Sequence, residues 1–205
     1  MNVFSQTSPW IRALAVAFDF FILQVLWCVC SLLVVTVGAA TTALHYAAMR
    51  RLEFDDTRMV SNFFSSFRAN FKQATLTFLI QAALTVVLAV DLYVALTTSG
   101  WLATILLIVC ALVVLPVVLT GLYIYPVISR FENTIPAQLR NAFFMSLHNF
   151  PTSLILLAVP AGTVLLIYWF PYLGFILLFA PALYAYYTSM FMIRVFRRYI
   201  SDRTE

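Results

Sequence analysis

Charged residues are scarce in this sequence. Only 10% of its 205 residues are Asp, Glu, Lys or Arg, whereas soluble domains usually contain about 25%. Hydrophobic residues reach 63%, against about 45–50% in soluble domains. A water-soluble chain of this length has no interior large enough to hide so much apolar surface. The scarcity of charge therefore excludes a soluble globular protein and a nucleic-acid binder, and it predicts an all-α integral membrane protein.

The sequence also lacks the motifs that usually identify an enzyme or a metal site. It contains no G-x-S-x-G, no H-E-x-x-H and no glycine-rich phosphate loop. Cys28 and Cys30 point about 200° apart on a helix, and Cys110 belongs to another apolar run, so the three thiols do not form one metal site. Neither His45 nor His148 has a second ligand or a nucleophile at helical spacing. We expect no enzymatic activity, no metal and no cofactor.

The sequence contains long apolar runs instead of such motifs. About 20 apolar residues cross the hydrocarbon core of a bilayer as a helix. The first run is longer than the core of a cleaved signal peptide, about 7–15 residues, so we expect it to be retained. The prediction is a single transmembrane domain, residues 1–205, with cytoplasmic connections at 38–73 and 125–152 and a basic tail at 194–205. The five predicted spans are residues 14–37, 74–96, 101–124, 153–170 and 175–193.

The basic residues predict an orientation. Connection 38–73 holds five Lys or Arg, connection 125–152 two and the tail four, which is 11 of the 12 in the chain. The short turns at 97–100 and 171–174 hold none. Because positive charge accumulates on the cytoplasmic side, both connections and the C-terminus are predicted to be cytoplasmic. Five spans then leave the N-terminus outside a multi-pass protein of the cell membrane.

Connection 38–73 contains an aromatic and basic segment. Every fourth residue from Met59 to Phe71 is apolar, and Phe64 widens this face, while Arg68 and Lys72 lie opposite. Such a helix either lies in the membrane interface, where it is free to dock on a partner, or packs on the protein's own spans. The candidate docking or interfacial residues are Phe63, Phe64, Phe67, Arg68, Phe71 and Lys72.

A short internal repeat indicates how the spans are organised. Residues 63–71 resemble residues 143–150 once one residue is skipped, and each copy stands just before a predicted span. Gly38 and Gly121 precede the two copies at similar distances. Two spans in each unit would give both units the same orientation. The pattern predicts a parallel two-span tandem repeat with short cytoplasmic interfacial helices, closed by the fifth span.

Two carboxylates fall inside predicted spans. Asp19 and Asp91 each lie a few turns from the outer end of their helices, so they are predicted to share one level of the outer leaflet. An ionisable group within a span is costly and is usually functional. One hypothesis is an outward-facing site for a cation, a proton or a polyol. The other is that water reaches each carboxylate and neither has a special role.

One set of residues resembles a known family. Trp27, the small-residue stretch at 35–44 and the segment from Phe63 to Gln73 are similar to the corresponding parts of YesL proteins. These are bacterial membrane proteins of about this length, and the resemblance extends over the whole chain. It implies a bacterial inner or plasma membrane location. Because YesL proteins tend to be encoded beside ABC-type sugar importers, it also implies an association with carbohydrate uptake.

Two classes of function follow from these patterns. The first is an accessory or regulatory membrane subunit, whose partners would be the bilayer and the subunits of an ABC sugar importer. The second is a small secondary transporter or channel that uses the two carboxylates. The oligomeric state is open. The absence of a charged residue near the middle of any predicted span favours the first class.

Overall fold

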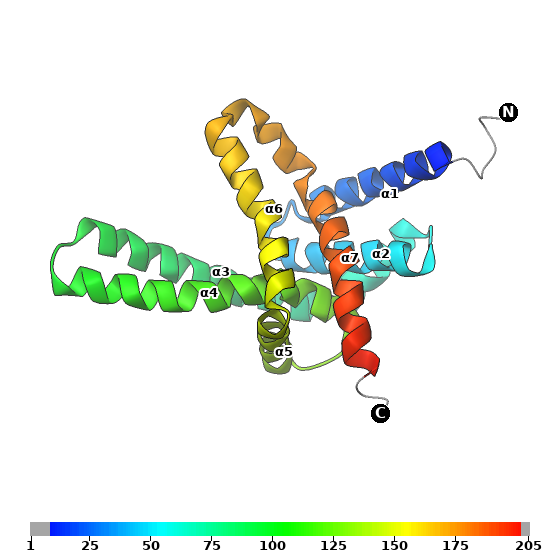
Figure 1. Cartoon of the computed structure of the whole chain (residues 1–205). Coiled ribbons are helices and arrows are strands. Elements are labelled where there is room, and N and C mark those ends of the chain that lie inside the picture. Colours follow the sequence, from blue (N-terminus) through cyan, green and yellow to red (C-terminus); the bar gives the residue numbers. More distant parts are fainter. Residues whose placement is uncertain (1–8, 202–205) are drawn as a thin grey trace.

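A computed structural model describes residues 9–201 of the chain, which fold as helices joined by short turns. Figure 1 shows three arms that extend in different directions from the region around α2: α1, the α3–α4 hairpin, and the α6–η2–α7 segment. The elements are α1 (Pro9–Cys30), η1 (Val34–Thr36), α2 (Val37–Phe54), α3 (Met59–Thr97), α4 (Trp101–Arg130), α5 (Ile135–His148), α6 (Phe150–Trp169), η2 (Pro171–Leu178) and α7 (Ala180–Ser201).

Three of the predicted spans correspond to helices that are long and apolar enough to cross a membrane. These helices are α3, α4 and α6, which contain the predicted spans 74–96, 101–124 and most of 153–170. An all-helical membrane protein is therefore the class that the structure supports. Five transmembrane helices are not confirmed, because the chain interrupts the first and the fifth predicted spans.

The first predicted span, 14–37, is not one helix. Helix α1 ends at Cys30, and α2 begins at Val37. The hydroxyl of Thr36 donates to the backbone carbonyls of Cys30 and Leu33, which satisfies carbonyl groups left free at the end of α1. Helix α2 then turns back along α1, where Trp27 Nε1 donates to Thr41 Oγ1 at 3.1 Å. The sequence did not predict this turn, because the apolar run continues through it and hydrophobicity alone does not distinguish a continuous span from a helical hairpin.

The fifth predicted span, 175–193, is also interrupted. Its first residues belong to the 3-10 helix η2, and α7 begins only at Ala180. The start of α7 is held by α1, since the side-chain carbonyl of Gln24 accepts a hydrogen bond from the Ala182 amide at 2.9 Å. This contact satisfies one of the free N–H groups in the first turn of α7. Gln24, which interrupts an apolar run in the sequence, thus joins two distant helices.

Helix α3 is longer than predicted. It runs for 39 residues without a break, about 58 Å, so the aromatic segment and the following span form one rod. The separate interfacial helix predicted before residue 74 is not formed. No proline or glycine stands between Met59 and Thr97 to end the helix, and Asn70 adds a local bond by donating to the Ser66 carbonyl at 3.1 Å.

The two copies of the internal repeat differ at their ends. The second copy forms α5, and the chain breaks at Asn149 before α6. Ser66 and its counterpart Ser146 are both buried, so the copies begin alike. The second copy lacks one residue, which would rotate all following side chains by about 100° on an unbroken helix. The break at Asn149, with Pro151 in the first turn of α6, separates the two registers.

Helix α2 is the centre of the molecule. Its small residues let the neighbouring helices approach closely, and a Cβ atom added to Gly38 would lie 2.4 Å from the backbone oxygen of Ala74 on α3. Close approach at small residues is the usual way in which helices pack where lipid removes the hydrophobic advantage of large side chains. The fully buried residues of α2 include Ala39, Ala40, Thr42, Ala43, Ala47 and Ala48.

Candidate functional site

The end of α2 carries a cluster of ion pairs that we call the α2 clasp. Six of the nine residues from Arg50 to Arg58 are charged, in a chain where charge is scarce. The clasp joins this segment to side chains from three other helices. Its members are Asp19, Arg50, Arg51, Glu53, Asp55, Asp56, Arg58, Arg130 and Arg197.

Arg51 attaches α1 to the clasp. Its Nε lies 2.8 Å from Asp19 Oδ2, and only 9% of the Arg51 side chain and 15% of the Asp19 side chain are exposed. Arg51 also pairs with the exposed carboxylate of Asp55, four residues along the chain. A charge so well shielded from water is stable only with a partner. Asp19 has this partner in Arg51, whereas Arg51 is balanced by both Asp19 and Asp55.

Glu53 attaches α4 and α7. Its Oε2 accepts a hydrogen bond from Arg130 Nη1 at 2.8 Å, and its Oε1 lies 3.6 Å from Arg197 Nε. Glu53 is largely buried, whereas Arg197 is mostly exposed. Arg130 is the last residue of α4, where a cation also compensates the negative end of the helix dipole. One carboxylate therefore holds the ends of two helices against α2.

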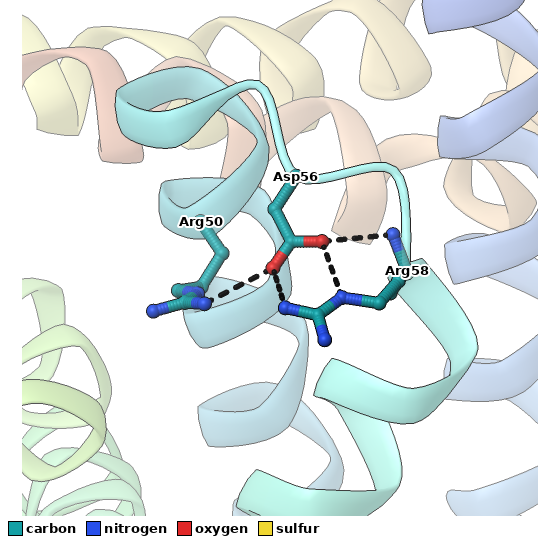
Figure 2. A network of polar contacts seen from close by, with 3 residues as sticks. All are labelled: Arg50, Asp56 and Arg58. Carbon is teal, nitrogen blue, oxygen red and sulfur yellow. Dashed lines mark hydrogen bonds and ion pairs between the residues drawn. The ribbon is translucent and has the colours of Figure 1, made fainter.

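The loop between α2 and α3 is held by Asp56. Figure 2 shows its carboxylate between two arginines, with Arg50 Nη2 and Arg58 Nη2 each 3.0 Å from Oδ2. The side chain and backbone N–H of Arg58 hold the pKa of Asp56 well below its usual range. Asp55, beside it, has a φ of 51°, a left-handed conformation that ends α2. The loop is thus a fixed corner between two helices.

The structure separates the two carboxylates that were predicted to share one level. Asp19 pairs with Arg51, close to the start of α3, whereas Asp91 lies 32 residues along α3 from Met59, about 48 Å. Asp91 is half-buried and makes no ion pair with the residues that the structure describes. A site made from both carboxylates is therefore not formed within this chain. The reason is the turn after Cys30, which sends α2 back along α1 and places Asp19 beside Arg51.

The aromatic segment divides into a buried side and an exposed side. Phe63 is fully buried against the small residues of α2, and it stacks on Phe67, which is half-buried. This arrangement corresponds to the prediction that the segment packs on the protein's own helices. Phe64 and Phe71 keep more than a third of their surface exposed. Two of the four candidate phenylalanines thus belong to the core of the protein, and two remain accessible.

The exposed side carries two cations. Arg68 and Lys72 are exposed and lie one helical turn apart, and neither makes an ion pair with the residues between 9 and 201. Together with Phe67 and Phe71 they border a shallow hollow of about 400 Å³. We call Val60, Phe64, Arg68, Phe71 and Lys72 the α3 face. It combines apolar contact area with free positive charge, a composition suited to an acidic or anionic partner.

His45, which lies in the predicted connection 38–73, is a buried polar residue in the structure. It lies inside α2, its ring is 6.5 Å from that of Tyr184 on α7, and its Nδ1 has no hydrogen-bond partner among residues 9–201. Burial lowers the pKa of His45 to about 3, so the ring is neutral at physiological pH. Within the described residues, no group of three or more His, Cys, Asp or Glu side chains is placed to hold a metal ion.

The clasp was missed as a site because its partners are far apart in sequence. Arg130 pairs with a residue 77 positions away, and no local pattern indicates such a contact. The one available signal was the high density of acidic and basic residues from Arg50 to Arg58. The positive-inside rule uses only the basic ones, so the acidic partners were not considered. A buried charge requires a partner, and this rule predicts that the acidic residues of the segment are engaged.

Comparison with known families gives one match. Residues 20–92 match a family described as a protein of unknown function, DUF624. The matched part contains the second half of α1, all of α2 and most of α3, and it includes the residues on which the resemblance to YesL proteins rests. The match is consistent with that resemblance, although it does not carry the name. No curated protein and no solved structure matches the chain.

Proposed function

We propose that this protein is an accessory or regulatory membrane subunit that docks on a partner through the α3 face. The observation that carries the proposal is the combination of exposed Phe64 and Phe71 with two cations that have no partner in the described part of the chain. Aromatic and arginine side chains are the residues that most often dominate protein interfaces. The resemblance to YesL proteins suggests ABC-type sugar uptake as the process served.

The packing beneath the α3 face supports this proposal. Phe63 anchors the helix on α2, and the corner at Asp56 fixes where the helix begins. A face held by a rigid support loses little conformational freedom when it binds. The ionisable side chains of the α3 face are two cations, Arg68 and Lys72. The arrangement suits recognition better than chemistry.

Affinity purification from native membranes in a mild detergent tests the proposal. We expect a partner to co-purify with the wild type and to be lost from Phe64→Ser, because a central apolar contact would be removed. The matched control is Phe144→Ser, since Phe144 occupies the equivalent repeat position on α5 and is also exposed. Equal recovery of the partner with both variants, or no partner with the wild type, would contradict docking through this face.

We further propose a multi-pass protein of the bacterial cell membrane with a cytoplasmic C-terminus, on the basis of the 11 basic residues on one side. The predicted outside N-terminus requires five crossings. The hairpin of α1 and α2, with Asp19 on Arg51, favours instead an N-terminus on the same side as Arg51. Single cysteines at Ser8, Ser65 and Ser99, in a chain without Cys28, Cys30 and Cys110, can be labelled in intact cells. We expect labelling of a cysteine at position 99 but not of one at position 65. Labelling at position 8 would place the N-terminus outside, and protection there would place it on the side of Arg51.

Transport by the chain alone is the second class of function. The distance between Asp19 and Asp91 removes the paired site on which that hypothesis depended. Solute flux in proteoliposomes that contain only this protein would favour transport, while a stoichiometric importer in the purified complex would favour the accessory role.

A further inference from the structure

A groove lies where α3, α4 and α5 meet. Its volume is about 250 Å³, and its lining is apolar apart from Gln81 on α3 and Thr120 on α4. Leu139 and Phe143 of α5 form one wall, and Pro116 of α4 forms part of another. Because α3 and α4 are both candidate membrane spans, hydrocarbon is the medium that would surround this groove.

The carboxamide of Gln81, the polar group in the groove, has two contacts with α4. The side-chain oxygen of Gln81 accepts a hydrogen bond from Tyr125 OH at 3.2 Å. Its Nε2 rests over Gly121, where an added Cβ would lie 2.5 Å from that nitrogen. Glycine at position 121 therefore provides the space that the carboxamide occupies. The geometry orients Gln81 by contacts with α4 on two sides.

Two hydrogen-bond donors in the groove have no acceptor within the described residues. Gln81 Nε2 and the hydroxyl of Thr120 form no hydrogen bond there, although both side chains line the groove. A free donor surrounded by hydrocarbon is costly, because no water is available to accept from it. The groove therefore favours an occupant that brings acceptor oxygens together with an apolar chain.

The depth of the groove indicates which acceptors these are. Gln81 lies seven residues inside the predicted span 74–96, a depth of about 10 Å, and it faces Gly121, three residues before the end of the predicted span 101–124, a depth of about 5 Å. Gln81 therefore lies in the part of the hydrocarbon core next to the boundary with the headgroup region. The ester carbonyl groups of a glycerophospholipid lie at this boundary. Arg140, on the same turn of α5 as Leu139, is exposed and makes no ion pair with the described residues, so it is available to a phosphate.

We propose that the groove binds one anionic phospholipid, with an acyl chain between α3 and α4, ester carbonyls on Gln81 and Thr120, and the headgroup beside Arg140. This site is separate from the α3 face, so its existence does not depend on the docking function. A lipid bound in this groove would make the position of α5 on the α3–α4 hairpin dependent on the lipid composition of the membrane.

Native mass spectrometry of the purified full-length chain tests this site. The probes are phosphatidylglycerol and phosphatidylcholine with identical acyl chains, added to protein in a lipid-free detergent. We expect one tightly held phosphatidylglycerol and about fivefold weaker retention of phosphatidylcholine, because one arginine near the membrane surface contributes about that factor. Arg140→Gln should abolish the preference between the two lipids while leaving binding itself intact.

Variants inside the groove separate a built site from a general coating of lipid. Gln81→Leu combined with Thr120→Val should weaken both lipids, about fivefold for each lost hydrogen bond. Val117→Phe should fill the groove and release the bound lipid. The control is Thr163→Val on α6, a threonine outside the groove, which should change nothing. Equal retention of both lipids by the wild type, or no release by Val117→Phe, would overturn the proposal.

Discussion

Helix α2 and the outer part of the α3–α4 hairpin are both helical, but they differ in how far their side chains are buried. In α2 the buried residues are small, such as Ala39 and Ala43, and both are fully covered by neighbouring helices. In the hairpin the residues are large, such as Val86 and Leu112, and most of each side chain is exposed. In a chain of this class, large apolar residues can face lipid, whereas small residues indicate where helices meet. Residue size therefore identifies the core better than hydrophobicity does.

The two aspartates show the same contrast. Asp19 belongs to the region around α2, where Arg51 balances its charge, and Asp91 belongs to the hairpin, where it has no ion-pair partner among the described residues. In the sequence both are single carboxylates within apolar runs. Substitutions in the region around α2 should therefore have larger effects than matched substitutions in other parts of the molecule, and four comparisons of variants test this difference.

Gly38→Ala should have the largest effect. The new Cβ would lie 2.4 Å from a backbone oxygen and 2.6 Å from Phe78 Cβ, so no change of rotamer relieves the clash. We expect a loss of about 3 kcal/mol in the free energy of unfolding, at the upper end of the usual cost of overpacking. Thermal unfolding in detergent would measure it. Gly162→Ala, where no atom lies within 4 Å of the added Cβ, should be neutral or stabilising. Equal losses from both would contradict the contrast.

His45 should make stability depend on pH. Its pKa is lowered to about 3 in the folded protein, against about 6.5 when unfolded, so the unfolded state binds more protons between these values. Stability is then fully present above pH 6.5 and falls as the pH falls, by up to about 1.4 kcal/mol per pH unit, or about 2 kcal/mol between pH 7 and pH 5. His45→Phe should remove most of this dependence. His148→Gln, which changes the exposed histidine of α5, should leave it unaltered.

Asp19→Asn should be more costly than Asp91→Asn. The first removes the charge that balances shielded Arg51, although Asp55 remains as a second partner, so we expect a loss of about 1.5 kcal/mol. The second changes a residue without an ion pair in the described chain and should alter stability by less than about 0.5 kcal/mol. Unfolding temperatures and the amount of each variant in membranes would be compared. A larger effect at Asp91 would indicate a role for the hairpin that this structure does not explain.

Gly121→Ala should have a much smaller effect on stability than Gly38→Ala. The added Cβ would meet only the end of the Gln81 side chain, which can rotate away, and alanine favours the helix by about 1 kcal/mol. We expect a net change below about 1 kcal/mol in unfolding experiments. Comparison with Gly38→Ala then shows how far the cost depends on whether the obstructing atom belongs to the backbone or to a flexible side chain.

The sequence by itself determined the class of this protein and three of its helices. Apolar runs at 74–96, 101–124 and 153–170 exceed or approach the thickness of a bilayer, and their residues need no distant partner to become helical. The aromatic periodicity from Met59 to Phe71 likewise predicted a helix with one apolar face. Such features depend on residues within one or two helical turns, so the local spacing of apolar residues is enough to predict them.

Only the tertiary structure decided how these helices meet. The turn after Cys30, the unbroken length of α3 and the pairing of Glu53 with Arg130 and Arg197 depend on contacts between residues far apart in the chain. The sequence does not indicate whether an arginine in a connection faces water, a lipid phosphate or a buried carboxylate. Its role is determined by which partner lies within about 4 Å of it, because the energy of an ion pair depends on that distance and on how far water is excluded.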